Sequence, residues 1–245
     1  MNEVLKQLSA SKSVRLFTDK AISQEDKAAI LHAATQAPTA GNQQLYTILD
    51  ITDGVLKEKL SVSCDNQPFI AEAKMVLIFC ADCQKWYDAY LDADCDARKP
   101  GVGDLLLAVS DATIAAQNAV TAAESLGIGS CYIGDIMENC ELHREMLHLP
   151  EYVFPAAMLV FGYPTEQQIA RKKPERAAMQ HIVHENGYRR MDGTELREML
   201  APKPLQKDYT EWLRAFCDRK YNSDFAREMT RSVAEYLKNF SLKAL

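Results

Sequence analysis

The longest apolar stretch of the chain, GDLLLAVSDATIAAQNAVTAAESLGIG, runs from residue 103 to residue 129. Its length would suit a membrane span, but polar side chains recur along it at helical spacing. These are Ser110, Thr113, Gln117, Thr121 and Glu124, with Asp111 and Asn118 beside them. Because so many polar groups would be costly in lipid, no membrane is implied. The stretch predicts a long, largely buried helix from about Gly103 to Leu126, at the centre of a core or in a subunit interface.

Strands and helices alternate around this helix, and 245 residues suffice for a single large domain or for a compact pair of smaller units. Apolar, β-favouring runs predict strands at Tyr46–Ile51, Met75–Cys80, Ser130–Ile133 and Ala156–Phe161. Caps and periodicity predict further helices at about Glu3–Ser9, Ser23–Ala37, Gly54–Ser61, Glu138–Leu147, Asp208–Arg219 and Ser223–Phe240. After Gly162 the composition becomes polar and charged, so the last 85 or so residues are expected to form an arm over the main body.

The charge balance and the cysteines narrow the class of protein. A net charge of −6 and a pI of about 5.5 argue against nucleic acid as the main partner. Seven scattered cysteines behind a polar N-terminal segment suggest free thiols in the cytoplasm. Cys80 and Cys83 have C-x-x-C spacing without a second pair, so packing is favoured over a metal or redox role. Motifs for a Rossmann site, a P-loop, a zinc protease and a serine hydrolase elbow are absent, and no metal site is predicted.

Four polar stretches are candidates for binding. SKSVR, residues 11–15, has cations and hydroxyls that can converge on an anion or a polar ring edge. APTAGNQQ, residues 37–44, offers neutral amide donors and acceptors. GIGSCYIGDI, residues 127–136, has glycines that let backbone N–H groups approach a ligand. Lys172, Lys173 and Arg176 form a basic cluster. Taken singly, each stretch is explained as well by a solvated surface or a turn.

Taken in order, the motifs resemble those of nitroreductase-like flavoproteins. SKSVRLFTDKAIS, APTAGNQQ, AAQNAVTAAESLGIGSCYIGDI and FGYPTEQQIARKKPER follow one another as in the larger, NADPH-preferring branch of oxygen-insensitive nitroreductases and flavin reductases. The likeness covers nearly the whole chain, and residues 10–190 carry it best.

The resemblance implies an α+β fold with a mainly antiparallel sheet, in an intertwined homodimer with FMN at the interface. Residues 1–245 would form a single domain with 163–245 as an extended C-terminal arm, whose apolar side chains need a partner surface. These are Trp212, Leu213, Phe216, Phe225, Tyr236, Leu237 and Phe240. The implied reaction moves a hydride from NADPH or NADH through flavin N5 to a nitroaromatic compound, a quinone or free flavin, by a ping-pong mechanism. A flavin-storage protein and a related flavin-dependent dehalogenase are the alternatives.

The resemblance also assigns residues to FMN, while no side chain is assigned as a catalytic acid or base because the flavin carries the chemistry. The cofactor-binding residues would be Ser11, Lys12, Ser13, Arg15, Thr39, Asn42, Gln67, Tyr132, Ile133, Gly134, Lys173 and Arg176. Arg15 would lie at the N1 edge of the ring, the Gly134 N–H would face N5, and Lys173 and Arg176 would hold the phosphate. Two departures stand out: Ser11 replaces the usual His or Arg, and the Lys-Pro-Glu-Arg spacing leaves Lys172 or Lys173 open as the phosphate ligand.

Overall fold

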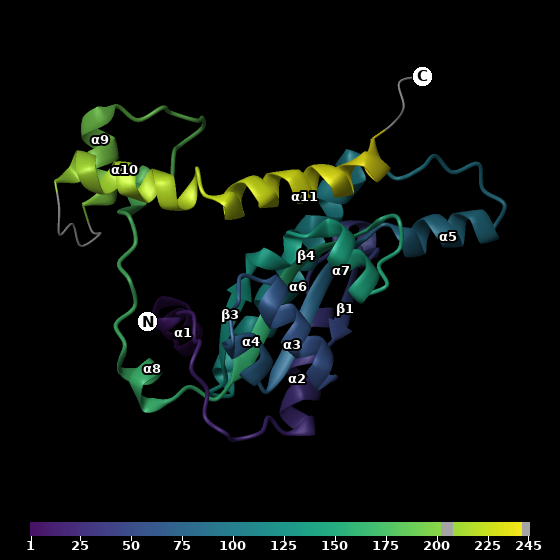
Figure 1. The fold of residues 1–245 in the computed structure, drawn as a ribbon, viewed down its shortest axis with the longest axis horizontal. Helices are drawn as coiled ribbons and strands as arrows, with labels where there is room; N and C mark the ends of the chain where they lie inside the picture. Colours follow the sequence, from purple (N-terminus) through teal and green to yellow (C-terminus); the bar gives the residue numbers. More distant parts are fainter. Residues whose placement is uncertain (202–207, 242–245) are drawn as a thin grey trace. The chain divides into compact units, whose positions relative to one another are not determined.

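The computed structural model describes residues 1–201 and 208–241. The described residues form one four-stranded sheet in the order β1-β2-β4-β3, in which all three neighbouring pairs are antiparallel (Figure 1). Its strands are β1 (Tyr46–Asp50), β2 (Met75–Asp82), β3 (Gly129–Ile133) and β4 (Val153–Gly162). The α+β class and the four predicted strands are therefore confirmed.

The two central strands are longer than the sequence predicted. Every residue of β2 and of β4 is buried, as expected for strands that are paired on both edges and covered on both faces. β4 begins before Pro155, which lacks an N–H for the ladder. The register shifts between Phe79 and Cys80, opposite Pro155, so an irregularity in the pairing accommodates the proline.

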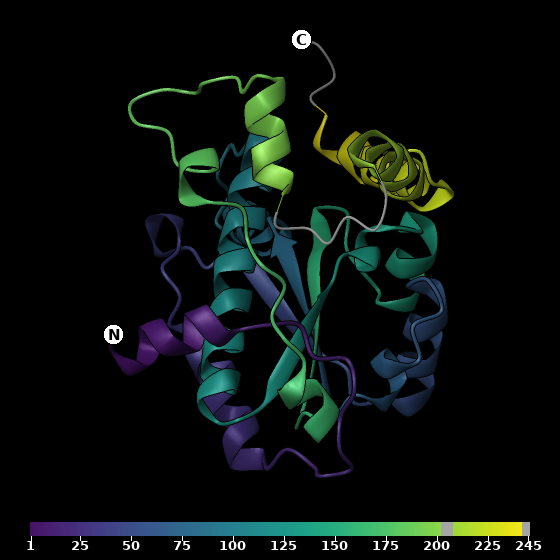
Figure 2. The same ribbon diagram turned by 90° about the vertical axis from the view of Figure 1, so that its left-hand side faces the viewer.

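One face of the sheet is covered by α6 (Val102–Ser125) and α2 (Gln24–Thr35), as Figure 2 shows. Small side chains let α6 approach the sheet closely, and six of its alanines have no exposed surface. These are Ala108, Ala112, Ala115, Ala116, Ala119 and Ala123. The predicted long helix is confirmed within one residue at each end. It is apolar and long enough to cross a membrane, but its packing against the sheet makes it a core helix.

The opposite face carries α3 (Gly54–Ser63), α4 (Phe69–Glu72), the 3₁₀ turn η2 (Gly134–Met137) and α7 (Cys140–Met146). The side chain of Asp53 caps α3 by accepting a hydrogen bond from the Val55 N–H at 2.9 Å. A single helix was expected over 138–147. It is found as α7, which begins at Cys140 because Asn139, its N-cap residue, adopts left-handed backbone angles.

The remaining elements are shorter or peripheral. They are α1 (Glu3–Ala10), η1 (Ala40–Asn42), α5 (Gln84–Asp92), α8 (Glu166–Ala170), η3 (Met179–His181), α9 (Gly193–Leu200), α10 (Tyr209–Lys220) and α11 (Asp224–Phe240). The helices α4, α5, α8 and α9 were not predicted from the sequence. The chain divides into one compact unit of residues 1–171 and 228–245, and a second of residues 172–227.

Two aromatic side chains of the C-terminal segment are buried within their own chain. Tyr236 and Phe240 are 0% and 1% exposed, and they pack edge-on against Phe154 and Tyr152 respectively. The expectation that both need a partner surface was therefore wrong, because α11 turns its apolar stripe onto the core.

Candidate functional site

Two facing glycines seat the N-terminal loop on the sheet. Gly129 of β3 pairs with Gly162 of β4, and a Cβ atom at Gly129 would lie 2.6 Å from the Cγ2 atom of Val14. A Cβ atom at Gly162 would lie 2.6 Å from the ring of Phe17. The Val14 N–H also donates to the Ser130 carbonyl at 2.8 Å. Gly129, which the sequence suggested for ligand approach, therefore makes room for the loop itself.

A second segment, around α8, holds the same loop from the other side. The Arg15 N–H donates to Oε1 of Gln168 at 3.2 Å, and the Arg171 guanidinium donates to the Ser13 carbonyl. Lys12 donates through Nζ to the carbonyls of Ile169, at 2.8 Å, and Arg171. The Lys12 ammonium thus fixes backbone carbonyls. Sequence reasoning did not assign Gln168 and Arg171, because neither forms a local motif with the loop.

Ser11 and Arg15 differ in what their side chains do. The Ser11 hydroxyl donates to Glu124 of α6 at 2.5 Å, which anchors the start of the loop. Arg15 is exposed, and its guanidinium carbon lies 6.0 Å from the ring centre of Phe69. Among the residues that the structure describes, no carboxylate forms an ion pair with Arg15. Its charge is therefore available to an anionic ligand.

Gln67 and the end of β3 complete this side of the site. The Gln67 Nε2 group donates to the Cys64 carbonyl at 2.8 Å and to the Asp135 carboxylate at 3.0 Å. Both amide hydrogens are thereby used, so Oε1 remains as an acceptor. Tyr132 is 42% exposed between buried neighbours and Gly134 is exposed, so the strand presents the Tyr132 ring and the Gly134 backbone. Asp135 was not predicted, although it adjoins Gly134.

An acidic group lies just behind this strand end. Glu138 is 6% exposed, and its Oε1 atom has no hydrogen-bond partner among the described residues. Burial, followed by the nearby carboxylates of Asp135, Asp65 and Glu228, raises the pKa of Glu138 to about 7. A carboxyl that carries a proton near neutral pH is therefore built into the turn after Gly134.

The amide-rich loop is organised by a buried carboxylate of α6. Asp111, 3% exposed, accepts the hydroxyl of Thr39 and the N–H groups of Ala40, at 3.1 Å, and Leu45, at 3.2 Å. Thr39 in turn accepts from the Gln44 N–H at 2.8 Å. The loop therefore holds its exposed residues, such as Asn42, in a fixed turn.

These two groups of residues lie apart within one chain. Asp111 and Glu124 anchor them on the same helix, thirteen residues apart, which corresponds to about 20 Å along its axis. The structure thus brings the 11–15 loop together with Gln67 and the 132–134 strand end, but not with Thr39 and Asn42. Lys173 and Arg176 lie in the unit of residues 172–227.

Cys80 and Cys83 form no disulfide, and all seven cysteines are free. Burial raises the pKa of both thiols to about 12. Thiols with so high a pKa are poor nucleophiles, which agrees with a packing role.

Comparison with known proteins shows the family to which this chain belongs. Residues 9–163 match the nitroreductase family. FMN reductase [NAD(P)H] of Bacillus subtilis (strain 168) is 34% identical over 239 residues, covering 96% of this chain and 91% of that protein. The oxygen-insensitive NADPH nitroreductase of Salmonella typhimurium (strain LT2) is 36% identical over 192 residues, covering 78% and 77%. The solved structure of B. megaterium NfrA2 superposes with a TM-score of 0.81 at 28% identity, covering 96% and 98%. By its sequence and its fold, the chain belongs to the nitroreductase family.

Proposed function

We propose that this protein is an FMN-dependent oxidoreductase that takes a hydride from NAD(P)H, with NADPH favoured, and delivers it to nitroaromatic compounds, quinones or free flavin in a ping-pong reaction. The observation that carries the proposal is the exposed Arg15, which has no carboxylate partner among the described residues and lies near the Phe69 ring and Cys131 of β3. The names of the relatives, an NAD(P)H-dependent FMN reductase and an NADPH nitroreductase, support the same reaction.

The donors and acceptors of the site fit a flavin mononucleotide. Bound FMN would supply the hydride-accepting chemistry. Arg15 would stabilise negative charge on the ring, Gln67 would accept from a ring N–H through Oε1, and the Gly134 N–H would donate to the ring. Lys173 and Arg176 would neutralise the phosphate. The Ser13 carbonyl and the Lys12 ammonium are held by protein contacts, so the loop is preorganised before a ligand binds.

A homodimer would complete the site. The exposed face of α6 carries Val102, Leu106, Leu107 and Ile114, between 40% and 62% exposed, which is a large apolar face for a monomer. A twofold axis crossing α6 midway between Asp111 and Glu124 would bring the Thr39–Asn42 loop of one protomer to the 11–15 loop of the other. The 20 Å separation within one chain would then place residues of both loops at one shared site.

A reducing cytoplasm is the compartment that we propose, and the seven free cysteines support it. The decisive experiment records the visible spectrum of the purified protein before and after NADPH, then with menadione or a nitroarene as acceptor. The expected result is a flavin spectrum that bleaches with NADPH and returns with the acceptor, with FMN rather than FAD released on denaturation. A protein that binds FMN but does not turn over would instead be a storage protein.

A further inference from the structure

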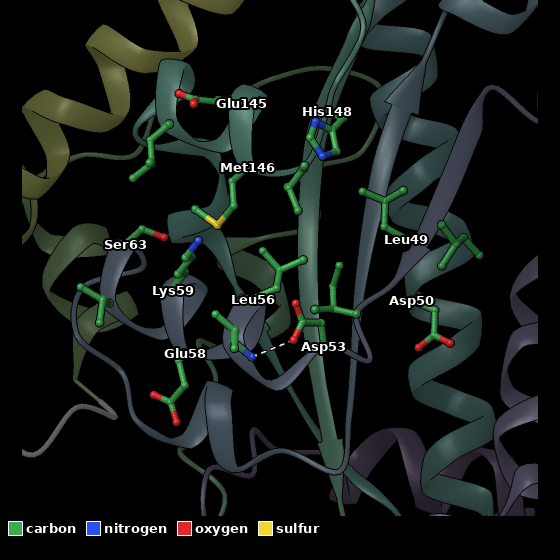
Figure 3. A pocket seen from close by; sticks show the side chains of 16 residues that line it. Leu49, Asp50, Asp53, Leu56, Glu58, Lys59, Ser63, Glu145, Met146 and His148 are labelled. Atoms are coloured by element: carbon green, nitrogen blue, oxygen red, sulfur yellow. Dashed lines mark hydrogen bonds between the residues drawn. The ribbon is translucent and has the colours of Figure 1, made fainter.

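A cavity of about 1220 Å³ lies between β1, α3 and α7, among residues that the proposed reductase function does not use. Figure 3 shows Leu56, Lys59 and Ser63 of α3 and Met146 of α7 lining it. Its volume is somewhat larger than the roughly 300–1,000 Å³ of typical small-molecule sites, so it has room for such a ligand.

Ser63 at one end of this cavity is hydrogen-bonded to a buried histidine. Its Oγ atom lies 2.8 Å from Nε2 of His143, and Nδ1 of His143 lies 3.0 Å from the Ile136 carbonyl. A carbonyl can only accept, so Nδ1 carries the proton and Nε2 is an acceptor. The Ser63 hydroxyl therefore donates to Nε2, and the Leu60 carbonyl, at 3.4 Å, is a second and more distant acceptor. This is the order of nucleophile, base and orienting group found in serine hydrolases.

The histidine is placed to remain an uncharged base. His143 is 0% exposed, and burial lowers its pKa, while backbone carbonyl groups oppose that shift. Ser63 is half-buried and lines the cavity, so it stands between the imidazole and the cavity.

We propose that Ser63 and His143 form an acyl-transfer dyad that hydrolyses esters of apolar carboxylic acids in this cavity, an activity independent of the proposed flavin chemistry. Apolar side chains of Leu56, Val62 and Met146 line the cavity and would hold the acyl chain. The Lys59 ammonium group belongs to the same face, one helical turn before Ser63, and would stabilise the oxyanion.

The reaction balances without a cofactor. The Ser63 oxygen bonds to the acyl carbon while its proton passes to Nε2 of His143. The ester C–O bond breaks, and the departing alkoxide takes that proton and leaves as the alcohol. Water then attacks the acyl-serine, His143 accepts its proton and returns it to the Ser63 oxygen, and the carboxylic acid is released. The net change is an ester and water to an acid and an alcohol.

The test uses FMN-loaded protein without NADPH, with 4-methylumbelliferyl butyrate and octanoate, which carry no nitro group. Wild-type protein should release the fluorescent alcohol, and Ser63→Ala and His143→Gln should each lower kcat/KM about 100-fold or more. Lys59→Met, at an exposed position that spares the buried pair, should lower kcat with a smaller change in KM. The matched control is Ser61→Ala, since among the described residues the Ser61 hydroxyl bonds only to the Glu58 carbonyl of its own helix, at 2.8 Å.

A fluorophosphonate probe gives a second, covalent readout. The wild-type protein should gain one adduct, mapped by peptide mass spectrometry to Ser63, and Ser63→Ala should gain none there. NADPH oxidation should be unchanged in Ser63→Ala, so failure of this proposal and failure of the reductase proposal are distinguishable. Equal ester hydrolysis by wild type and Ser63→Ala, or labelling elsewhere only, would show that the pair merely ties α3 to α7 and would overturn the proposal.

Discussion

The carboxylate of Asp111 accepts the hydroxyl of Thr39, and this contact joins the long central helix to the amide-rich loop. The same carboxylate takes two backbone N–H groups of that loop, from Ala40 and Leu45. Two backbone N–H groups of the loop thus donate to one buried carboxylate and not to the carbonyl groups of a helix or a sheet.

Replacing Asp111 with Ala should destabilise the protein by about 1–3 kcal/mol, because buried donors would be left without an acceptor. Asp111→Asn should cost less, since one side-chain oxygen remains. FMN affinity should fall in both variants if the loop borders the flavin. Urea unfolding and flavin titration measure the two effects. Ser110→Ala, the neighbouring exposed position, should leave both unchanged, and an equally stable Asp111→Ala would refute the anchoring role.

Gly129→Ala should displace the N-terminal loop, because the new Cβ atom would lie 2.6 Å from Val14. Overpacking of this kind costs about 1–3 kcal/mol. We expect a lower melting temperature and weaker FMN binding, measured by calorimetry and by flavin fluorescence. Gly103→Ala has open space around it and serves as the control. Unchanged FMN binding in Gly129→Ala would separate the loop from the flavin site.

Arg15→Gln should lower the reduction potential of the bound flavin, because the reduced ring would lose its counter-ion. One charge-assisted hydrogen bond is worth roughly 1.5–3 kcal/mol, so reduction by NADPH should slow about tenfold or more. Lys173→Gln and Arg176→Gln should instead weaken FMN binding with little change in potential. Redox titration, stopped-flow reduction and flavin dissociation constants distinguish the two groups. If Arg15→Gln loses FMN while its remaining holoenzyme keeps the wild-type potential and rate, Arg15 is instead a phosphate ligand.

Ile114→Glu should disrupt the proposed dimer, because it places a charge on the exposed apolar face of α6. Multi-angle light scattering at micromolar concentration should show a dimer for wild type and a monomer for the variant, together with loss of bound FMN. Val55→Glu, on α3 and 63% exposed, is the control for a surface charge that should not matter. A flavin-loaded wild-type monomer would contradict the shared site.

Glu138 should make stability depend on pH between about 4.5 and 7. The pKa of this carboxyl is raised from 4.5 to about 7 in the folded protein. The unfolded chain therefore releases this proton at a lower pH than the folded protein does. As pH rises across that window, the free energy of unfolding falls by up to about 3 kcal/mol. Glu138→Gln should remove the dependence, as measured by urea unfolding at pH 5 and pH 8.

Glu141→Gln should change the pH dependence of stability at acidic pH instead, as measured by urea unfolding. The Arg231 guanidinium lowers the pKa of Glu141 to about 2, so the stabilisation that this ion pair contributes is present above pH 4.5 and is lost as pH falls toward 2.

For Glu138, identical pH profiles of stability for Glu138→Gln and wild type would show that its carboxyl is ionised at neutral pH.

Local patterns in the sequence determined the main elements. The alternation of apolar runs and turn residues located all four strands, and helical spacing of polar groups located α6 within one residue at each end. The order of the four motifs also identified the family, since a family signature needs only the linear sequence. Boundaries failed where long-range pairing extended a strand, as in β2 and β4, and the helix expected from Glu138 begins two residues later, after the left-handed Asn139.

Only the tertiary structure decided which side chains are held by the protein and which face a ligand. Lys12 and Arg15 look alike in the sequence, yet Lys12 fixes carbonyls 157 and 159 residues away while Arg15 remains exposed. Asp111, Asp135, Gln168 and Arg171 gain their roles from contacts between distant segments. The pairing of Ser63 with His143 likewise joins residues 80 positions apart. Periodicity and turn chemistry act over a few residues, so such contacts exist only once the sheet has brought its helices together.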